Sequence, residues 1–219
     1  DIKLYAKWTA GASSYTVEHY QEKLNGTYPD TAQDIDTGLI GTTDASISAD
    51  SIKKNYPGFE YDYMNPADPK IGADGSTVVK VYYKRKPYTV NFSVDGSGGH
   101  IETDVTGGTD APPTESSIKV KFGGSVTFTA QPDRGYEVDS WTGATANTPN
   151  TTATLAVTAN TTVTVKFKKI TTVNAGDGAW KLLREVVRIA DNNAIITING
   201  EIKATTTSGN NGEIVINKN

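Results

Sequence analysis

The sequence predicts a mainly β fold with minor α content, arranged as small modules in tandem. Threonine makes up 31 of the 219 residues, and its β-branched, half-polar side chain suits strands with one wet face. Alternating strand patterns recur near residues 4–8, 79–84 and 163–168. Two of them are followed by similar strand starts at Tyr15 and Tyr88, 73 residues apart. Internal repetition of this kind indicates a tandem array.

The chain divides into four segments by this pattern. Residues 1–13 are expected to be the tail of an upstream β repeat, and residues 14–86 and 87–169 to be two complete modules. Residues 170–219 have a different character. Because strand patterns stand at both ends, we expect a segment cut from a longer protein. The connections between segments are very short, which limits flexing and favours a rod over loosely strung beads.

The first module is expected to be a β sheet crossed by one short helix. Its opening strand lies at 15–20 and its closing strand at 77–86. Between them come a long polar stretch without Lys or Arg over 25–50, a short helix within 45–55, and a turn at 55–59 that leads into an aromatic strand. A β-grasp arrangement fits this order.

The second module is predicted to be almost purely β. Its turns are marked by the glycine-rich 96–99, by Gly123 and Gly124, and by 132–135, and 107–117 is a loop. The region 141–164 contains ten Thr residues, so its strands have one dry and one hydroxylated face. The predicted strands are 88–94, 117–122, 125–130, 136–141, 152–157 and 162–168.

The last fifty residues are expected to begin a solenoid. Asp177 is predicted to cap an amphipathic helix that ends at Asn192 and Asn193. Short strands are expected at 194–198 and 201–204, and a further strand-like run at 213–216. So short a segment buries little core alone, whereas a helix that caps the first rung of a parallel β-helix would have a partner to cover.

These residues resemble repeat families of bacterial surface proteins. Residues 4–9 look like the closing strand of a Listeria–Bacteroides (internalin B-type) repeat, and 15–20 with 56–59 are similar to mucin-binding-protein (MucBP) repeats. Residues 105–169 resemble the divergent internalin B-type repeat, and 180–219 look like the cap and first rung of a pectate-lyase-like β-helix. The resemblance implies an extracellular or cell-surface location in bacteria.

Composition and charge exclude several kinds of site and partner. The formal net charge is −4, which disfavours nucleic acid and anionic membrane as partners. The chain has no Cys, and therefore no disulfide framework, thiolate metal site or cysteine nucleophile. No apolar run approaches the roughly 20 residues of a membrane span, so we expect no membrane insertion within this segment. In isolation we expect a monomer.

Four aromatic residues of the first module form the candidate ligand-binding cluster. Tyr56, Phe59, Tyr61 and Tyr63 lie within eight residues, and alternation predicts that Tyr61 and Tyr63 share one strand face. If exposed, they would stack on sugar rings of a glycan or glycoprotein; if buried, they are the core of the module.

No catalytic residue, metal site or cofactor is predicted. The two histidines, His19 and His100, lie in different modules without metal-ligand spacing. Asp34 and Asp36 have oxygens suited to calcium, but the loop lacks the EF-hand spacing, and a solvated acidic loop is the alternative.

The function expected from these observations is that of a non-enzymatic segment of a bacterial surface protein. It would act as a semi-rigid stalk, with adhesion to host or matrix glycoproteins as a further role. The alternative is a set of accessory carbohydrate-binding modules of a β-helical polysaccharide-acting enzyme.

Overall fold

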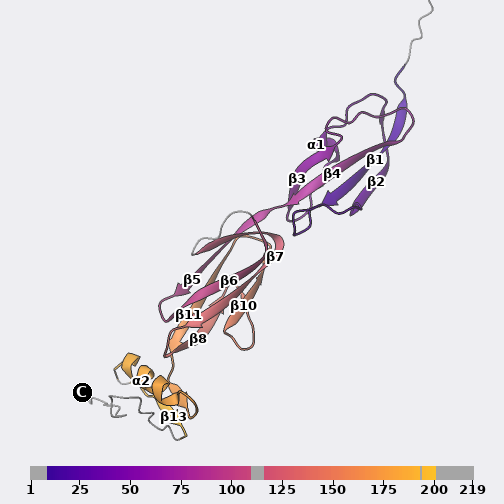
Figure 1. Cartoon of the computed structure of the whole chain (residues 1–219). Coiled ribbons are helices and arrows are strands. Elements are labelled where there is room, and N and C mark those ends of the chain that lie inside the picture. Colours follow the sequence, from indigo (N-terminus) through magenta and orange to yellow (C-terminus); the bar gives the residue numbers. More distant parts are fainter. Residues whose placement is uncertain (1–8, 110–115, 193, 201–219) are drawn as a thin grey trace, which may run out of the picture.

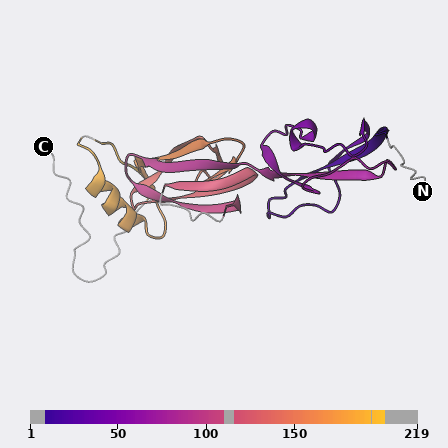
Figure 2. The same ribbon diagram turned by 90° about the horizontal axis from the view of Figure 1, so that it is seen from above.

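The computed structural model describes residues 9–109, 116–192 and 194–200. Two β modules lie end to end, and a small helical segment follows the second module (Figure 1). The same elongated arrangement is seen from above in Figure 2. The strands predicted at 4–8, 201–204 and 213–216 lie outside the described residues.

The first module is a four-stranded mixed sheet with one short helix. Its strands are β1 (Ala12–Gln21), β2 (Asp34–Thr42), β3 (Phe59–Asn65) and β4 (Thr77–Arg85), in the order β2-β1-β4-β3. The first and last strands, β1 and β4, are parallel neighbours at the centre of the sheet, and the two outer pairings are antiparallel. The helix α1 (Ala49–Ile52) connects β2 to β3 beside the sheet (Figure 1). The mainly β prediction is confirmed here.

One face of this sheet carries the core because apolar side chains alternate along the two central strands. Val79, Val81 and Tyr83 of β4 point to the same side as Val17 of β1 and are almost fully buried. Ile52 of α1 packs on this core. The remaining buried members of the cluster are Ile47, Phe59 and Ile71.

Strand β2 lies within the polar stretch to which no strand was assigned. Its partner on the sheet is β1, with His19 opposite Asp34 and Val17 opposite Asp36. The two carboxylates point toward the core side, where a predicted strand would carry apolar residues, and Lys54 forms ion pairs with both. The strand was therefore missed because its acidic residues resemble those of a solvated loop, while Lys54, which neutralises them, lies elsewhere in the sequence.

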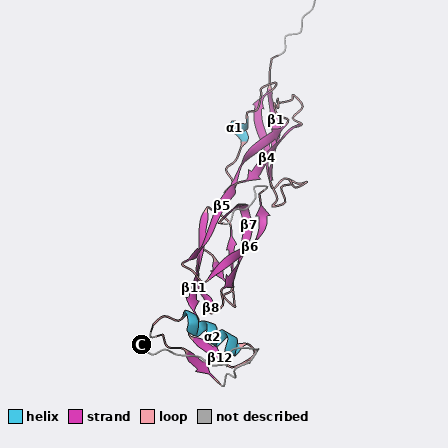
Figure 3. Ribbon diagram, turned by 60° about the vertical axis from the view of Figure 1, so that its left-hand side comes forward, coloured by secondary structure: helices cyan, strands magenta, loops and turns pink. Residues whose placement is uncertain are grey.

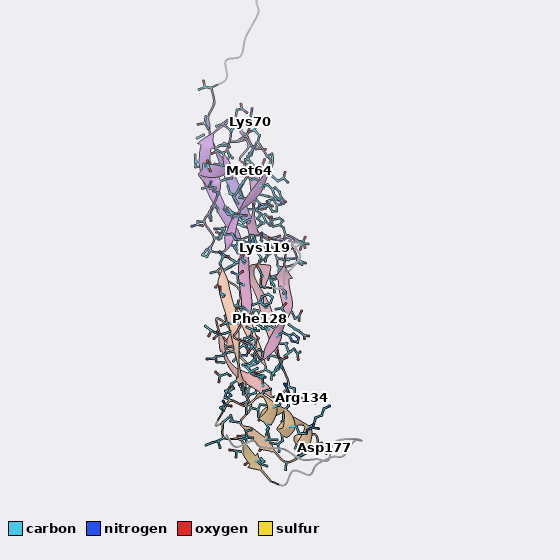
Figure 4. The ribbon with its side chains drawn as sticks, turned by 90° about the vertical axis from the view of Figure 1, so that its left-hand side faces the viewer. Met64, Lys70, Lys119, Phe128, Arg134 and Asp177 are labelled. Atoms are coloured by element: carbon cyan, nitrogen blue, oxygen red, sulfur yellow. The ribbon has the colours of Figure 1, made fainter. Side chains whose placement is uncertain are left out.

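The second module is a seven-stranded sheet. Its order is β8-β11-β5-β7-β10-β9, and β6 pairs with the other edge of β7. The first and last strands, β5 and β11, are again parallel neighbours. Its core contains Phe128 and Val163, both fully buried, and Figure 4 shows Phe128 within this module. The strands are β5 (Pro87–Asp95), β6 (Gly99–Gly108), β7 (Ser117–Pro132), β8 (Tyr136–Thr142), β9 (Thr145–Ala146), β10 (Thr152–Ala156) and β11 (Thr161–Lys169).

The turn predicted at Gly123 and Gly124 is wrong, because β7 runs through both residues as one strand. Gly123 has a φ of +78°, which glycine adopts without a steric penalty. A Cβ on Gly124 would lie 2.5 Å from the carbonyl oxygen of Thr106. The glycine pair thus allows a bend and a close approach of β6, not a chain reversal. Strand β6 itself was missed because its residues alternate between half-buried and exposed with few large apolar side chains.

The third segment contains one helix between two short parallel strands. The strands β12 (Thr172–Asn174) and β13 (Thr197–Asn199) pair in parallel, and α2 (Ala179–Ile189) connects them (Figure 3). Asp177 does not cap α2: the N-cap is Gly178, in a left-handed conformation and without a side-chain cap bond. Among the described residues, no helix is long and apolar enough to cross a membrane.

Candidate functional site

The face of the first sheet opposite the core carries a row of stacked tyrosines, which we call the tyrosine ladder (Tyr20, Tyr82 and Tyr63). The three residues come from adjacent strands, β1, β4 and β3, and stand opposite one another in register. The rings of Tyr20 and Tyr82 stack at 5.0 Å and 20°, and those of Tyr82 and Tyr63 at 4.3 Å and 14°. Tyr20 is buried, whereas Tyr63 is 44% exposed. The ladder therefore ends in an accessible aromatic ring.

Charged and aromatic neighbours fix the ladder in place. Tyr28 meets the rings of Tyr82 and Tyr63 edge-on at 4.8 and 5.9 Å. Its hydroxyl donates a 2.8 Å hydrogen bond to Asp62, and burial together with this bond raises its pKa well above the ordinary value. A hydrogen bond to Glu18, with burial, raises the pKa of Tyr20 to about 12. Both hydroxyls therefore stay protonated, as hydrogen-bond donors, to a higher pH than an ordinary tyrosine.

The structure separates the four predicted site residues. Phe59 is buried in the core, and Tyr56 and Tyr61 pack against the same core. Tyr63 alone lies on the opposite face. The prediction that Tyr61 and Tyr63 share a face is wrong, because a β-bulge at Asp62 inserts one extra residue into β3.

A buried hydrogen-bond chain runs along the core side of the first module. His19 is fully buried, with Nδ1 2.9 Å from the Tyr83 hydroxyl and Nε2 3.2 Å from Asp36. The backbone N–H of Lys54 donates to the Tyr83 oxygen at 2.9 Å. The Tyr83 hydroxyl thus connects the Lys54 backbone N–H to one ring nitrogen of His19, and Asp36 pairs with the other ring nitrogen. Both ring nitrogens of His19 therefore have hydrogen-bond partners within the module, as is typical of a histidine with a structural role.

The two aspartates considered for calcium bind an ammonium group instead. Lys54 Nζ lies 2.7 Å from Asp34 and 2.6 Å from Asp36, and Tyr56 donates to Asp34 at 2.9 Å. The hydrogen bonds from Lys54 hold the pKa of both carboxyls below the ordinary value. Within the described ranges, no group of three or more His, Asp or Glu residues is placed to hold a metal ion.

The most extensively built site is the joint between the two modules. Strand β4 ends at Arg85 and β5 begins at Pro87, so Lys86 alone links them. The Lys86 N–H donates to the Gly58 carbonyl and the Lys86 carbonyl accepts from Phe122, each at 2.9 Å. The linker is therefore hydrogen-bonded to one module through its N–H and to the other through its carbonyl.

Three polar side chains clamp this joint. Arg85 donates from Nε to the Glu22 carbonyl and from Nη1 to the Phe122 carbonyl, both at 2.7 Å. Glu22, only 9% exposed, accepts the Arg85 backbone N–H at 2.8 Å through one carboxylate oxygen. Its other oxygen is 2.8 Å from Lys121 Nζ in the second module. Charge-assisted bonds of this kind are among the stronger hydrogen bonds in proteins.

An aromatic side chain of the second module enters the first. Phe122, at the middle of β7, packs against the core of the first module and meets the Phe59 ring edge-on at 5.9 Å. It also contacts Tyr88 at 6.5 Å. A Cβ on Gly58 would lie 2.1 Å from the Phe122 ring, so glycine leaves the space that this ring occupies. The apolar core thus extends across the joint.

Sequence reasoning predicted a short connection but none of the clamp residues. Glu22 and Arg85 are 63 residues apart, and Glu22 and Lys121 are 99 apart. No local motif relates residues at such separations. Only Pro87, the first residue of β5, indicated a stiff joint from the sequence. Proline is accepted at the start of a strand, and its fixed φ restricts the conformations of the linker.

One protein-family model matches part of the chain. Residues 100–171 match the family model of the divergent InlB B-repeat domain, which confirms the repeat predicted for the second module. No curated protein sequence matches the chain. The resemblance to surface-protein repeats is thus confirmed for the second module.

Several solved structures of surface-protein repeats are similar to the chain. One is the type 2 repeat of the mucus binding protein MUB from Lactobacillus reuteri, at 17% identity and a TM-score of 0.28, covering 72% of this chain and 99% of that one. Another is Mub-RV, at 13% identity and 0.27, covering 72% and 98%. A third contains SHIRT domains 3–4 of a streptococcal cell surface protein, at 13% and 0.20, covering 71% and 99%.

Proposed function

We propose that this chain is a non-enzymatic, semi-rigid spacer of a bacterial surface protein. The observation that carries the proposal is the joint, where a one-residue linker, a clamped carboxylate and an inserted phenylalanine fix two modules end to end. Linkers this short, with both ends hydrogen-bonded, leave little freedom between the modules. A rod projects a distal domain at a defined distance, which a flexible chain does not.

Further features of the proposal rest on the architecture. The modules are taken as 14–86 and 87–169, and the strand order of the first, with its parallel central pair and single helix, supports a β-grasp variant. The parallel pair of β12 and β13 supports the beginning of a β-helix in the last segment. An extracellular or cell-surface location is proposed from the InlB-type repeat.

Nuclear spin relaxation of backbone amides tests the spacer directly. In the wild-type chain, one anisotropic rotational diffusion tensor should describe the amides of both modules, because the joint makes the modules tumble together. A variant with Gly-Ser-Gly inserted between Lys86 and Pro87 is the control, and its modules should tumble separately. If the wild type already shows independent tumbling, the spacer proposal fails.

A second function, glycan binding, is favoured by the exposed end of the tyrosine ladder. Tyr63 offers a ring face for stacking on a sugar. Glu60 and Asp62 precede it on the same strand, and their carboxylates lie 3.5 and 3.9 Å from Lys84 Nζ. The two carboxylates could accept hydrogen bonds from sugar hydroxyl groups, and Lys84 could donate one. This site would serve either adhesion to glycoproteins or the accessory role in a polysaccharide-acting enzyme.

Binding of the full chain to a glycan array and to mucin tests this second function. Tyr63→Ala should abolish binding and lower the stability of the first module by only about 1–3 kcal/mol, because the ring makes two aromatic contacts but lies at the exposed end of the ladder. Ile40→Ala is the matched control, since Ile40 is a 68% exposed apolar residue on the same sheet face. Equal loss in both variants would indicate non-specific adsorption and count against a glycan site.

A further inference from the structure

A basic depression lies where the third segment meets the second module. It is lined by Arg134 from the β7–β8 turn and by Lys181, Arg184, Glu185 and Arg188 from α2. Figure 4 shows Arg134 at the end of the second module, next to the helical segment. Four cations and one carboxylate gather here on a chain whose net charge is −4.

The helical spacing brings the α2 residues onto one face. Positions 181 and 188 are each three and four residues from 184 and 185, so the four side chains lie on one side of the helix. The opposite face, with Ala179, Leu183 and Val186, is buried. The basic face is consequently available, whereas the apolar face holds the helix against its own segment.

Contacts with the second module fix the position of α2. A Cβ on Gly135 would lie 2.7 Å from Ile189 Cδ1 and 3.5 Å from Glu185 Cγ. The Ile170 N–H donates to the Gly135 carbonyl at 2.8 Å, and Lys169 forms an ion pair with Asp191. Arg134 is next to Gly135, so these contacts keep it at the rim of the helix face.

The cations of the depression are only partly neutralised. Arg188 pairs with Glu185, and its hydrogen bonds, helped by the charge of Arg134, hold the pKa of Glu185 below the ordinary value. Among the residues that the structure describes, Arg134, Lys181 and Arg184 have no ion-pair partner. Three uncompensated charges within one small hollow repel one another, and an anion that binds there relieves this repulsion.

We propose that the basic depression binds an anionic sugar, through a sulfate or carboxylate group held by Arg134, Lys181 and Arg184. Arginine presents a planar fork of donors that suits both groups. This inference concerns a different surface from the joint and from the tyrosine ladder, and it does not depend on the proposed function of either.

The lining favours a saccharide over other anionic ligands. No residue that lines the depression is apolar, so it lacks the hydrophobic anchors with which proteins hold peptides. Its volume of about 370 Å³ is at the small end of ligand sites and matches one or two sugar rings. Glu185 accepts from sugar hydroxyls, while the net negative charge of the chain opposes a long polyanion such as a nucleic acid.

Isothermal titration calorimetry of the full chain tests the proposal with three disaccharide probes: a sulfated one, a uronic-acid-containing one and a neutral parent. We expect binding of at least one anionic probe at low salt, weakened severalfold in 0.5 M salt, and none of the neutral parent. Arg184→Gln and Arg134→Gln should each weaken binding about tenfold, because each removes a charge-assisted contact.

Lys119→Gln is the control, because it removes one positive charge from an exposed position on β7 far from Arg134 (Figure 4). An unchanged affinity in this variant supports a local site. Three results would overturn the proposal: equal losses in the control and in the arginine variants, no binding of either anionic probe, or tighter binding of a short single-stranded oligonucleotide than of both sugars.

Discussion

Truncation of Phe122 to alanine should loosen the joint without unfolding either module. The ring projects from β7 of the second module onto the core of the first, where it covers Gly58 and meets Phe59. The variant keeps the backbone hydrogen bond from residue 122 to Lys86 and the Arg85 clamp, because both use main-chain atoms of residue 122. It therefore removes the apolar part of the joint alone.

The size of the effect follows from the ring contacts. Phe122 makes two edge-on aromatic contacts, with Phe59 at 5.9 Å and with Tyr88 at 6.5 Å. Such pairs contribute about 0.5–1.5 kcal/mol each. Only the Phe59 contact crosses the joint, but the ring also buries apolar area against the first core, so we expect a loss of about 1–3 kcal/mol in coupling. The ratio of docked to undocked modules should fall about 5- to 150-fold.

Electron–electron distance measurements between two spin labels report this change. The chain has no native cysteine, so Ala73→Cys and Ser97→Cys, both exposed, accept labels without background. These positions flank the run from Thr77 to Asp95, and at about 3.3 Å per residue the labels lie about 60 Å apart. Wild type should give one narrow distance, and Phe122→Ala a broad distribution that extends to shorter distances.

Phe122→Leu serves as the control, because leucine keeps an apolar side chain over Gly58 and should leave the distribution nearly narrow. A Phe122→Ala distribution as narrow as that of the wild type would show that the Phe122 ring does not couple the two modules. The polar clamp of Glu22, Arg85 and Lys121 alone would then hold the modules. Loss of the unfolding transition in the alanine variant would also contradict it, since the joint is not required for either core.

Two further predictions concern the stability of each module. Lys54 holds the pKa of Asp34 and Asp36 below the ordinary value, so both carboxylates stabilise the fold above about pH 4 and lose this contribution as pH falls through their lowered folded-state pKa. Urea unfolding between pH 5 and pH 2 should therefore show a steeper loss of stability in wild type than in Lys54→Met; parallel curves would contradict this. Gly124→Ala should destabilise the second module by about 1–3 kcal/mol, because its Cβ would meet a carbonyl oxygen of β6 at 2.5 Å. Thermal unfolding measures this loss, and Gly11→Ala, with no atom within 4 Å of the added Cβ, should leave the unfolding temperature unchanged. Equal effects of the two variants would show that the packing around Gly124 relaxes.

Alternation predicted most strands because their apolar residues point to one core. The strand at β4 is an example: Val79, Val81 and Tyr83 are buried and the residues between them are not. Where the pattern was interrupted, the prediction failed. In β3 the alternation continues through Asp62, and only the register with β4 shows that one residue is extra. A bulge is set by the partner strand, so the sequence of β3 alone did not contain it.

Long-range charge compensation was the other source of error. Asp34 and Asp36 made β2 look like a solvated loop, because the lysine that neutralises them is about twenty residues further along the chain. The prediction of the candidate site was also incomplete because it used only residues close together in the sequence. Aromatic clustering placed the candidate site in the first module and included Tyr63, but Tyr82 and Tyr20, which complete the ladder, come from strands outside the cluster. A search for aromatics at paired strand positions would have found them.

The parallel pairing of first and last strands has a mechanical consequence. The chain enters the first module at β1 and leaves it at β4, and these strands are bonded side by side over seven registered residue pairs. The second module repeats the plan with β5 and β11 over six. A pull on the two ends of either module drives the paired strands past each other, so all their hydrogen bonds bear the load at once and none is peeled open first. Extension under force is governed by the rate of unfolding. In this geometry a module can extend only after all hydrogen bonds between its paired first and last strands break together.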